Sequence, residues 1–401
     1  MKLFHSILSS TLVAVTVAAP ALKAAESSQQ PASFYPIGIS GGQNAKVAGR
    51  LFDIDGRVER FAGTNAWWLA HLQDNADVDK VLDEVAKTGY KILRVWAFGN
   101  VNEVPDLAET DLTHQVYFQV LNSSGAYINW AANGIPRLDY VVSSAEKHGI
   151  KLVLPFVNNW DDYGGINTYS AAFGSNATSF YTDPTTQAAY KSYIKTVITR
   201  YADSPAIFAW ELCNEPRCQG CDTSVITKWA AETSAYVKSL DPGHMITLGD
   251  EGWLAPDDGL GDGSYAYAGG IGIDFAANLK IKTLDYGVFH LYPDSWGYNY
   301  TWGSTWIEQH DALGKAAGKP VILEEYGAPF PHNHTGVEGP WQATVLKSGL
   351  AADQIWQFAT PYLTVPVEDI IDVNSIFYND TEYATLAKEH AAQMLAKAAS
   401  E

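Results

Sequence analysis

The chain has 401 residues, enough for one large domain or two to three small ones. Lys plus Arg number 26 and Asp plus Glu number 45, so the formal net charge is −19. This charge disfavours nucleic acid and anionic membrane surfaces as partners, because both bind basic protein surfaces. Hydrophobic residues make up 47% and charged residues 18%, which excludes a disordered chain and allows a large core.

The first 21 residues are typical of a secretory signal peptide. Lys2 and His5 precede an apolar run over 7–19, which is too short to span a bilayer and is followed by small residues. A buried N-terminal helix is the alternative. Residues 22–34 form a short polar lead-in, and we expect one domain over 35–398. Five Asn-x-Ser/Thr sequons fit a secreted, extracellular glycoprotein: Asn122, Asn176, Asn299, Asn333 and Asn379.

Residues 45–61 are predicted to form a small β-hairpin that turns at Asp55-Gly56. Apolar, strand-like runs follow at 61–66, 92–98, 151–157, 207–213, 245–249, 287–292, 321–326 and 354–358. Amphipathic helical patterns alternate with them at 78–87, 136–148, 185–201, 224–240, 275–280, 306–317, 341–349 and 383–398. Asp77 and Asp183 are predicted to cap two of these helices.

Strands that are apolar on both faces and alternate with helices indicate a parallel sheet wrapped in helices. Eight such units favour an α/β protein with a (β/α)8 TIM barrel and a small N-terminal hairpin over an open sheet. No G-x-G-x-x-G motif follows the first strand, so we expect no dinucleotide site. No linker or second module is evident, and nothing in the sequence demands more than a monomer.

The three cysteines exclude a disulfide scaffold. A single C-x-x-C pair, Cys218 and Cys221, cannot complete a tetrahedral zinc site, so a local disulfide is the expectation for an oxidising compartment. Cys213 lies in an apolar strand and is expected to be a buried thiol. His332 and His334 lack a third ligand and indicate a solvated loop. We therefore predict neither a metal site nor a cofactor.

The active site of such a barrel lies at the C-terminal ends of its strands. Burying an ionisable side chain beside apolar strands costs free energy. Glu215 after the fourth strand and Glu325 at the end of the seventh are therefore candidates for a functional role. Two carboxylates that meet across a barrel mouth suit glycoside hydrolysis, in which one donates a proton and the other is nucleophile or base. Tryptophans near strand ends could stack on sugar rings: Trp67, Trp68, Trp96, Trp160, Trp253, Trp296, Trp302 and Trp356.

These positions resemble glycoside hydrolase family 5, and more narrowly the fungal endo-β-1,4-mannanases. The blocks are Gly-Thr-Asn-Ala-Trp-Trp at 63–68, Arg-Val-Trp at 94–96, the run at 156–165, Trp-Glu-x-x-Asn-Glu-Pro at 210–216, His-x-Tyr at 290–292, Glu-Glu-Tyr-Gly at 324–327 and Trp356. The resemblance covers about residues 35–395. Many family 5 enzymes carry a histidine after strand three. This chain has Asn158-Asn159-Trp160 there, as the fungal mannanase group does.

The resemblance implies a role for each matching residue. Glu215 is expected to be the general acid/base and Glu325 the nucleophile. Glu324 is expected to point to the other face of its strand, since side chains alternate along a strand.

The other residues predicted to bind substrate surround this pair. Asn214 is expected to bond the sugar 2-hydroxyl, Tyr292 to hydrogen-bond the nucleophile, and Arg94 to keep it ionised. Trp356 is expected to form the platform at the cleavage point. The remaining contacts are His290 near the acid/base, Trp96 and Trp160 in the pocket, and Arg217 on the leaving-group side.

Structural roles remain alternatives for several of these residues. Arg94 could serve mainly as an ion pair inside the barrel, and Trp96 and Trp356 could be core residues. His290 could take no part in proton transfer. Asp250-Glu251 is interpreted as a supporting or rim pair.

The sequence therefore predicts a retaining endo-β-1,4-mannanase that acts on mannan, galactomannan and glucomannan, with polysaccharide as its partner. In a retaining site the two carboxyl groups stand about 5–5.5 Å apart. A β-1,4-glucanase or an exo-acting mannanase of the same fold is the alternative among enzymes. A non-catalytic carbohydrate-binding barrel is the alternative from another class.

Overall fold

The computed structural model of the chain describes residues 42–106 and 112–397, so the predicted signal peptide and lead-in lie outside the described residues. An eight-stranded parallel sheet forms its centre, in the order β11-β10-β9-β5-β4-β14-β13-β12. The strands are β4 (Phe61–Asn65), β5 (Ile92–Arg94), β9 (Lys151–Pro155), β10 (Ile207–Glu211), β11 (Met245–Thr247), β12 (Gly287–Leu291), β13 (Val321–Tyr326) and β14 (Ala352–Ile355).

Backbone hydrogen bonds join the two outermost strands of this order. The Asp285 N–H donates to the Ile246 carbonyl at 2.8 Å, and the His290 N–H donates to the Glu251 carbonyl at 3.3 Å. The sheet therefore closes on itself, and the predicted (β/α)8 barrel is confirmed.

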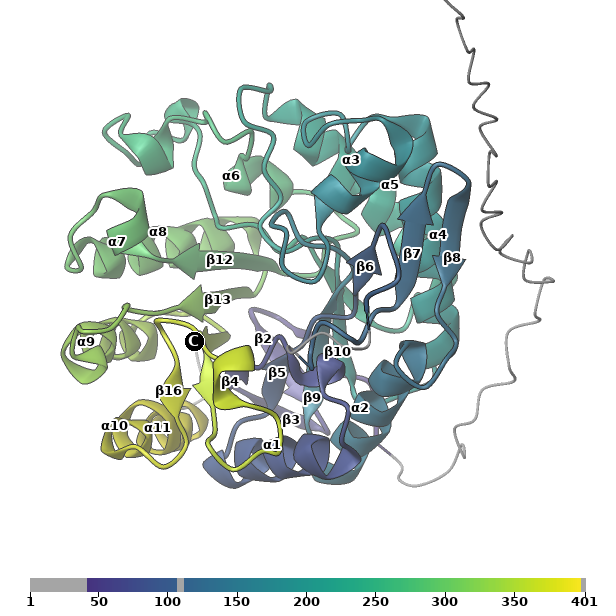
Figure 1. Ribbon diagram of the computed structural model, residues 1–401. Helices are drawn as coiled ribbons and strands as arrows, with labels where there is room; N and C mark the ends of the chain where they lie inside the picture. Colours follow the sequence, from purple (N-terminus) through teal and green to yellow (C-terminus); the bar gives the residue numbers. More distant parts are fainter. Residues whose placement is uncertain (1–41, 107–111, 398–401) are drawn as a thin grey trace, which may run out of the picture. The chain divides into compact units, whose positions relative to one another are not determined.

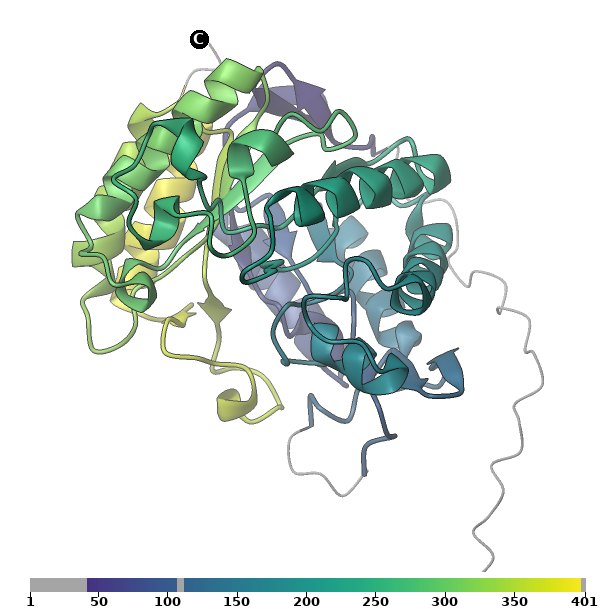
Figure 2. The same ribbon diagram turned by 90° about the horizontal axis from the view of Figure 1, so that it is seen from above.

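Helices cover the outside of the barrel (Figure 1; Figure 2). They are α1 (Asn75–Thr88), α2 (Ile135–His148), α3 (Ile166–Phe173), α4 (Pro184–Tyr201), α5 (Ser224–Leu240), α6 (Phe275–Asn278), α7 (Pro293–Trp296), α8 (Trp302–Ala317), α9 (His334–Lys347), α10 (Thr381–Tyr383) and α11 (His390–Ala396). The spacing of apolar residues sets the buried face: α1 buries Val78, Val81, Leu82 and Val85. Among the described residues, none of the helices is long and apolar enough to span a membrane.

Side-chain caps mark where several helices begin, α1 and α4 among them. Asp183 accepts a hydrogen bond from the Thr186 N–H at 2.8 Å, so it caps α4 as predicted. The prediction that Asp77 caps the preceding helix was wrong, because Asp74 caps α1 and the helix gains a turn. The Asp77 carboxylate instead accepts from the backbone and hydroxyl of Thr364.

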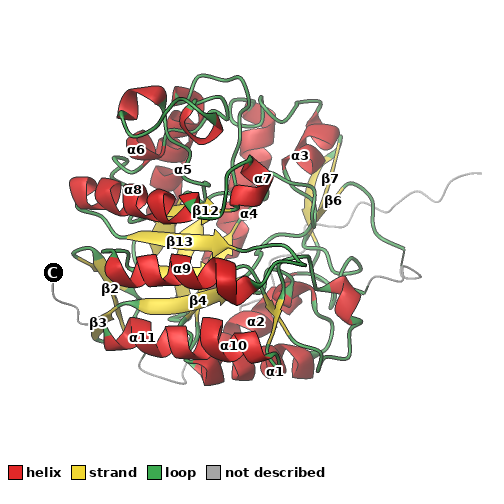
Figure 3. Ribbon diagram, turned by 90° about the vertical axis from the view of Figure 1, so that its left-hand side faces the viewer, coloured by secondary structure: helices red, strands yellow, loops and turns green. Residues whose placement is uncertain are grey.

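The N-terminal hairpin is present and has one strand more than expected. The small sheet consists of β1 (Lys46–Ala48), β2 (Leu51–Ile54) and β3 (Arg57–Glu59). Asp55 and Gly56 form the turn, with φ of 54° and 81° that suit a two-residue hairpin connection. The ring of Phe52 lies 5.0 Å from Phe208 and 5.3 Å from Tyr286, inside the barrel core. This sheet closes the N-terminal end of the barrel (Figure 3).

The C-terminal end of the barrel carries elements that the sequence patterns did not predict (Figure 3). A second small sheet consists of β6 (Asn100–Val101), β7 (Gln119–Asn122) and β8 (Gly125–Ile128), and β15 (Phe358–Ala359) pairs with β16 (Ile376–Phe377). These strands have two to four residues, which is too short for a hydrophobic period to stand out. The side chain of Gln119 joins β6 to α3, donating to Asn100 at 2.6 Å and to Tyr169 at 2.8 Å.

Candidate active site

A cleft of about 750 Å³ opens at the C-terminal ends of the barrel strands. Eight of the predicted site residues line it: Trp96, Trp160, Asn214, Glu215, Arg217, Tyr292, Glu325 and Trp356. The other two, Arg94 and His290, are fully buried and contact the carboxylates of that lining. Trp67 and Trp296, two of the tryptophans expected to stack on sugars, and Glu251, expected to be a supporting or rim residue, also line the cleft. The remaining lining residues had no predicted role: His114, Asn158, Asp162, Ser295, Glu368, Asp369, Ile371, Asp372 and Asn374.

Glu215 lies just beyond β10 on a backbone that few residues adopt. Its φ is 48°, in the left-handed region, and its N–H donates to the Gly249 carbonyl at 2.8 Å. The adjacent N–H of Asn214 donates to the Val157 carbonyl, also at 2.8 Å. These bonds from two neighbouring strands hold the strained turn and aim the carboxylate into the cleft. Its Oε2 accepts from Trp160 Nε1 at 2.6 Å.

Glu325 lies near the end of β13, and the residue is 3% exposed. Its Oε2 accepts a hydrogen bond from the Tyr292 hydroxyl at 2.8 Å, and its Oε1 accepts from the guanidinium of Arg94. Two donors on one carboxylate stabilise the ionised form.

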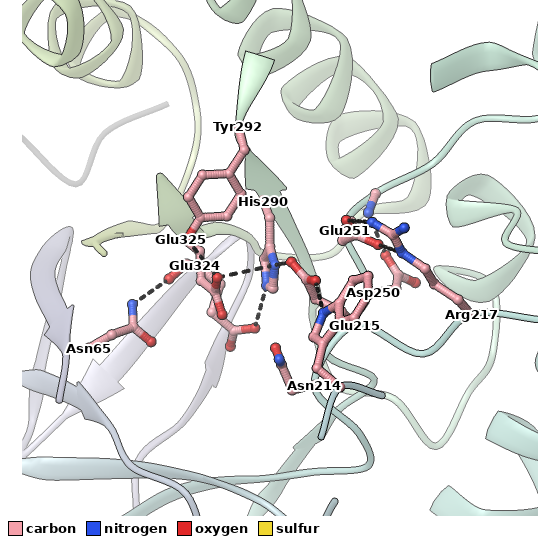
Figure 4. Close-up of polar contacts among 12 residues, drawn as sticks. Asn65, Asn214, Glu215, Arg217, Asp250, Glu251, His290, Tyr292, Glu324 and Glu325 are labelled. Atoms are coloured by element: carbon pink, nitrogen blue, oxygen red, sulfur yellow. Dashed lines mark hydrogen bonds and ion pairs between the residues drawn. The ribbon is translucent and has the colours of Figure 1, made fainter. Parts of the chain in front are cut away.

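Glu215, Glu325 and His290 form one cluster (Figure 4). His290 Nδ1 lies 2.7 Å from Glu215 Oε1 and 3.5 Å from Glu325 Oε2. One atom from each of the three residues lies within 4.8 Å of the others. The two carboxylates therefore face each other at close range. Within the described ranges this trio is the one set spaced for a metal ion, but the Arg94 guanidinium bonded to Glu325 opposes a second cation.

Arg94 connects four acidic or amide side chains in the floor of the cleft, those of Glu211, Asn214, Glu325 and Asn65. Its Nε and Nη2 pair with both oxygens of Glu211, at 2.8 and 2.6 Å, and Nη2 also donates to Asn214 Oδ1 at 2.8 Å. A third nitrogen, Nη1, donates to Glu325. Arg94 thus both forms an ion pair inside the barrel and donates to the predicted nucleophile. The structural and the functional interpretations of this residue are therefore compatible.

The expectation that Glu324 faces away from the site was wrong. Its carboxylate is fully buried inside the barrel, 3.5 Å from His290 Nε2 and 3.6 Å from Arg94 Nε (Figure 4). The cause is an irregularity in the pairing of β12 with β13: Phe289 pairs with Leu323 and the next residue, His290, pairs with Glu325. Glu324 is the extra residue of a β-bulge, so the simple alternation of side chains fails there.

Burial and mutual charge shift the pKa values of the cluster. Burial alone would lower the pKa of His290, but the charge of Glu325 and the hydrogen bond with Glu215 raise it well above its ordinary value. Burial alone would raise the pKa of Glu215, but His290 and Arg217 outweigh it and lower the pKa. Burial raises the pKa of Glu325, against the opposing charges of His290 and Arg94. Because the three groups shift one another's pKa values, they titrate as one coupled unit rather than independently.

Indole rings form one wall of the cleft. Trp67 stacks on Trp356 with centroids 6.2 Å apart and planes 7° from parallel, and Trp96 lies 5.8 Å from Trp356. The Nε1 of Trp356 donates to Asp372 at 2.6 Å. The Nε1 atoms of Trp67 and Trp96 are buried and have no hydrogen-bond partner among the described residues.

Arg217 and Glu251 form a bidentate pair on the opposite wall, at 2.7 and 2.5 Å. The guanidinium also lies over the ring of Trp160, 4.7 Å from its centroid. Burial and the charge of Glu215 raise the pKa of Glu251 to about 7, against Arg217. Burial also raises the pKa of Asp250 to about 7, but that residue does not line the cleft.

A disulfide links Cys218 to Cys221, as predicted, in the loop that follows Arg217. Cys213 is a buried free thiol, also as predicted. The expectation of a solvated loop was wrong for His334: it begins α9, is 6% exposed, and lies 2.7 Å from a carboxylate oxygen of Glu382.

Known proteins resemble this chain over nearly its whole length. The chain is 48% identical over 386 residues to mannan endo-1,4-beta-mannosidase A of Hypocrea jecorina, which covers 96% of this chain and 83% of the relative. It is 46% identical over 399 residues to mannan endo-1,4-beta-mannosidase A of Aspergillus aculeatus, covering 99% of this chain and 100% of the relative.

Solved structures show the same similarity. The endo-1,4-beta-mannanase from Rhizomucor miehei superposes with a TM-score of 0.80 at 35% identity, covering 88% of this chain and 100% of that one. The endo-beta-1,4-mannanase from Thermotoga petrophila gives a TM-score of 0.75 at 32% identity, covering 86% and 79%. A family model described as GH family 5 beta-mannosidase-like matches residues 43–334. The resemblance inferred from the motifs is thereby confirmed, and the chain belongs to glycoside hydrolase family 5, in its β-mannosidase-like group.

Proposed function

We propose that this protein is a secreted, retaining endo-β-1,4-mannanase that cleaves internal bonds of mannan, galactomannan and glucomannan. The observation that carries the proposal is the pair of carboxylates, Glu215 and Glu325, with oxygens within 4.8 Å in a tryptophan-lined cleft. A separation of about 5–5.5 Å is typical of retaining enzymes, whereas inverting enzymes need about 6.5–9.5 Å to admit a water. The names of the relatives, all mannanases or mannosidases, support mannan as the substrate.

In the first step, an oxygen of Glu325 attacks the anomeric carbon and the glycosidic C–O bond breaks. Glu215 transfers a proton to the departing oxygen, so the leaving chain departs as a neutral alcohol. His290, whose Nδ1 lies 2.7 Å from Glu215 Oε1, would share this proton with Glu215 before the transfer. The product is a glycosyl ester on Glu325.

In the second step, a water attacks the same carbon from the side that the leaving chain vacated. Glu215, now a carboxylate, takes a proton from that water, and the ester bond to Glu325 breaks. Two displacements at one carbon restore its configuration, so the product has the anomeric configuration of the substrate.

The surrounding residues have roles that follow from their contacts. Arg94 and Tyr292 donate to Glu325 and favour its ionised, nucleophilic form. Asn214, held by Arg94 at its Oδ1, would bond the sugar 2-hydroxyl. Trp356 would carry the sugar at the cleavage point, beside the rings of Trp67 and Trp96. Arg217 and Trp160 would bind the leaving-group side.

The test compares hydrolysis of galactomannan with that of carboxymethyl cellulose, and adds the products formed from mannohexaose. We expect reducing ends from galactomannan, a rapid fall in viscosity, and internal cleavage of mannohexaose. Preference for carboxymethyl cellulose would establish a glucanase, and release of single end units would establish an exo-acting enzyme. Binding without any hydrolysis would contradict catalysis altogether. The control variant Glu338→Gln, which changes a fully buried carboxyl on α9 outside the cleft, should hydrolyse galactomannan as the wild type does.

Secretion and a monomeric state are part of the proposal. Residues 1–21 as a signal peptide, and the five sequons, support export into an oxidising compartment, where the disulfide between Cys218 and Cys221 is stable. Expression of the full chain in a fungal host tests this: we expect processed, glycosylated enzyme in the medium and a monomer by light scattering. Retention of the uncleaved chain in the cells would contradict secretion.

A further inference from the structure

Glu324 is a fully buried carboxyl that the two-step reaction does not use. Neither of its side-chain oxygens has a hydrogen bond within the described part of the chain. Two basic groups lie close to it: His290 Nε2, at 3.5 Å, and Arg94 Nε, at 3.6 Å. Burying an ionisable group without a hydrogen bond is costly, so its position calls for a function.

His290 lies between Glu324 and Glu215 and presents a different nitrogen to each (Figure 4). When Glu215 carries the proton for the leaving group, Nδ1 must accept that O–H. A neutral imidazole then has its single proton on Nε2, which faces Glu324. When the proton moves onto His290, both nitrogens carry hydrogen and both face carboxylates. Nε2 is therefore protonated in both states, and Glu324 is the acidic group that faces it.

Other charged groups around His290 are already engaged. From β10 comes Glu211, paired with Arg94, and from β13 comes Glu325, bonded to Arg94 and Tyr292. After β11, Glu251 pairs with Arg217, and Asp250 accepts from Asn278 at 3.2 Å and from the Gly252 N–H at 2.9 Å. From α8, Trp306 donates its neutral Nε1 to the His290 carbonyl at 2.9 Å. Glu324 is the carboxylate of this group that lacks a hydrogen bond.

We propose that Glu324 is a positioning residue that keeps Nε2 of His290 protonated and so retains a transferable proton on the His290–Glu215 pair. The inference rests on the proposed role of Glu215 as acid/base. The charge of a carboxylate 3.5 Å from the ring favours the protonated pair. Glu324 acts through His290 and does not touch the substrate.

The variant Glu324→Gln keeps the size and an acceptor oxygen but removes the charge. Because a nearby anion raises the pKa of the pair, we expect the alkaline limb of kcat/KM to move down by about one to two pH units. The ¹⁵N titration of His290 in substrate-free enzyme should move by the same amount. Glu338→Gln, which removes a buried carboxyl elsewhere, should leave both unchanged, and Glu324→Asp should restore part of the shift.

An unchanged alkaline limb and an unchanged His290 titration in Glu324→Gln would overturn the proposal. A purely structural role would lower activity equally at every pH. If the variant does not fold, the wild type decides: at its pH optimum Nε2 must be protonated by ¹⁵N shift, and a neutral ring with hydrogen only on Nδ1 would refute the inference. The ¹⁵N measurement needs no substrate. It therefore separates failure of this proposal from failure of the mannanase assignment.

Discussion

Tyr292→Phe should move the acid limb of the pH profile. The hydroxyl of Tyr292 donates to Glu325 Oε2 at 2.8 Å, and the ring is otherwise held by packing, so the variant removes one hydrogen bond and little else. A hydrogen bond to a charged group contributes about 1.5–3 kcal/mol. Its loss favours the neutral carboxyl and raises the pKa of Glu325, which burial already places above its ordinary value.

One pKa unit corresponds to about 1.4 kcal/mol, so the lost bond should raise the pKa of Glu325 by about one to two units. Glu325 must be ionised to attack, so activity rises with pH as it loses its proton. We therefore expect the acid limb of kcat/KM for mannohexaose to shift upward by that amount, with the alkaline limb in place. Thermal unfolding controls for stability. An acid limb at the wild-type pH would refute the claim that Tyr292 stabilises the ionised form of Glu325.

Three further predictions address other residues. Glu215→Ala should slow hydrolysis of mannan by about 10²–10⁴-fold. An activated aryl β-mannoside, whose leaving group needs no proton, should still show a burst of phenol, and azide should restore turnover by forming the β-mannosyl azide. Loss of the burst would contradict the assignment of Glu215 as the acid/base. Trp160→Phe keeps an aromatic ring over Arg217 but removes the indole N–H that lies 2.6 Å from Glu215, so kcat on mannan should fall about tenfold. An unchanged kcat would contradict a catalytic contribution from that hydrogen bond. Asp241→Asn should lower the free energy of unfolding by about 2 kcal/mol at pH 6, because hydrogen bonds from His244 and Trp210 outweigh burial and lower the pKa of Asp241 from 3.8 to about 2. This stabilisation is complete above the unfolded pKa and is lost as the pH falls through about 2. Urea unfolding should therefore show a smaller difference between variant and wild type at pH 2.5, and an equal difference at both pH values would disprove the prediction.

The barrel was predictable because each strand is apolar on both faces and each is followed by a helical period. The side chains at the strand ends were predictable for the same reason, since the fold brings every C-terminal end to one mouth. The small strands β6, β7 and β8 were not predictable, because two to four residues give no period. They matter to the site: β6 is tied to the loop that follows β9 by the Asn100 N–H, which donates to the Tyr163 carbonyl at 2.8 Å.

Glu324 shows where sequence reasoning failed at the site itself. Period-two alternation predicts that neighbours on a strand face opposite sides, and only the register of β12 against β13 reveals the bulge. Glu211 was not predicted to belong to the site, although an acidic residue at the end of an apolar strand could have indicated it. In the structure its carboxylate accepts from two nitrogens of Arg94. Asp372 gave no comparable signal, because its place in the cleft depends on how loops far apart in sequence meet.

Covalent trapping tests the central claim most directly. The wild-type enzyme would be incubated with a 2-deoxy-2-fluoro-β-mannosyl fluoride, and the labelled peptide identified by mass spectrometry. The fluorine destabilises the oxocarbenium-like transition states, and the reactive leaving group allows the ester to form faster than it is hydrolysed. We predict a single fluoromannosyl adduct on Glu325. An adduct on Glu215 or another acid, or no adduct together with a product of inverted configuration, would contradict the account.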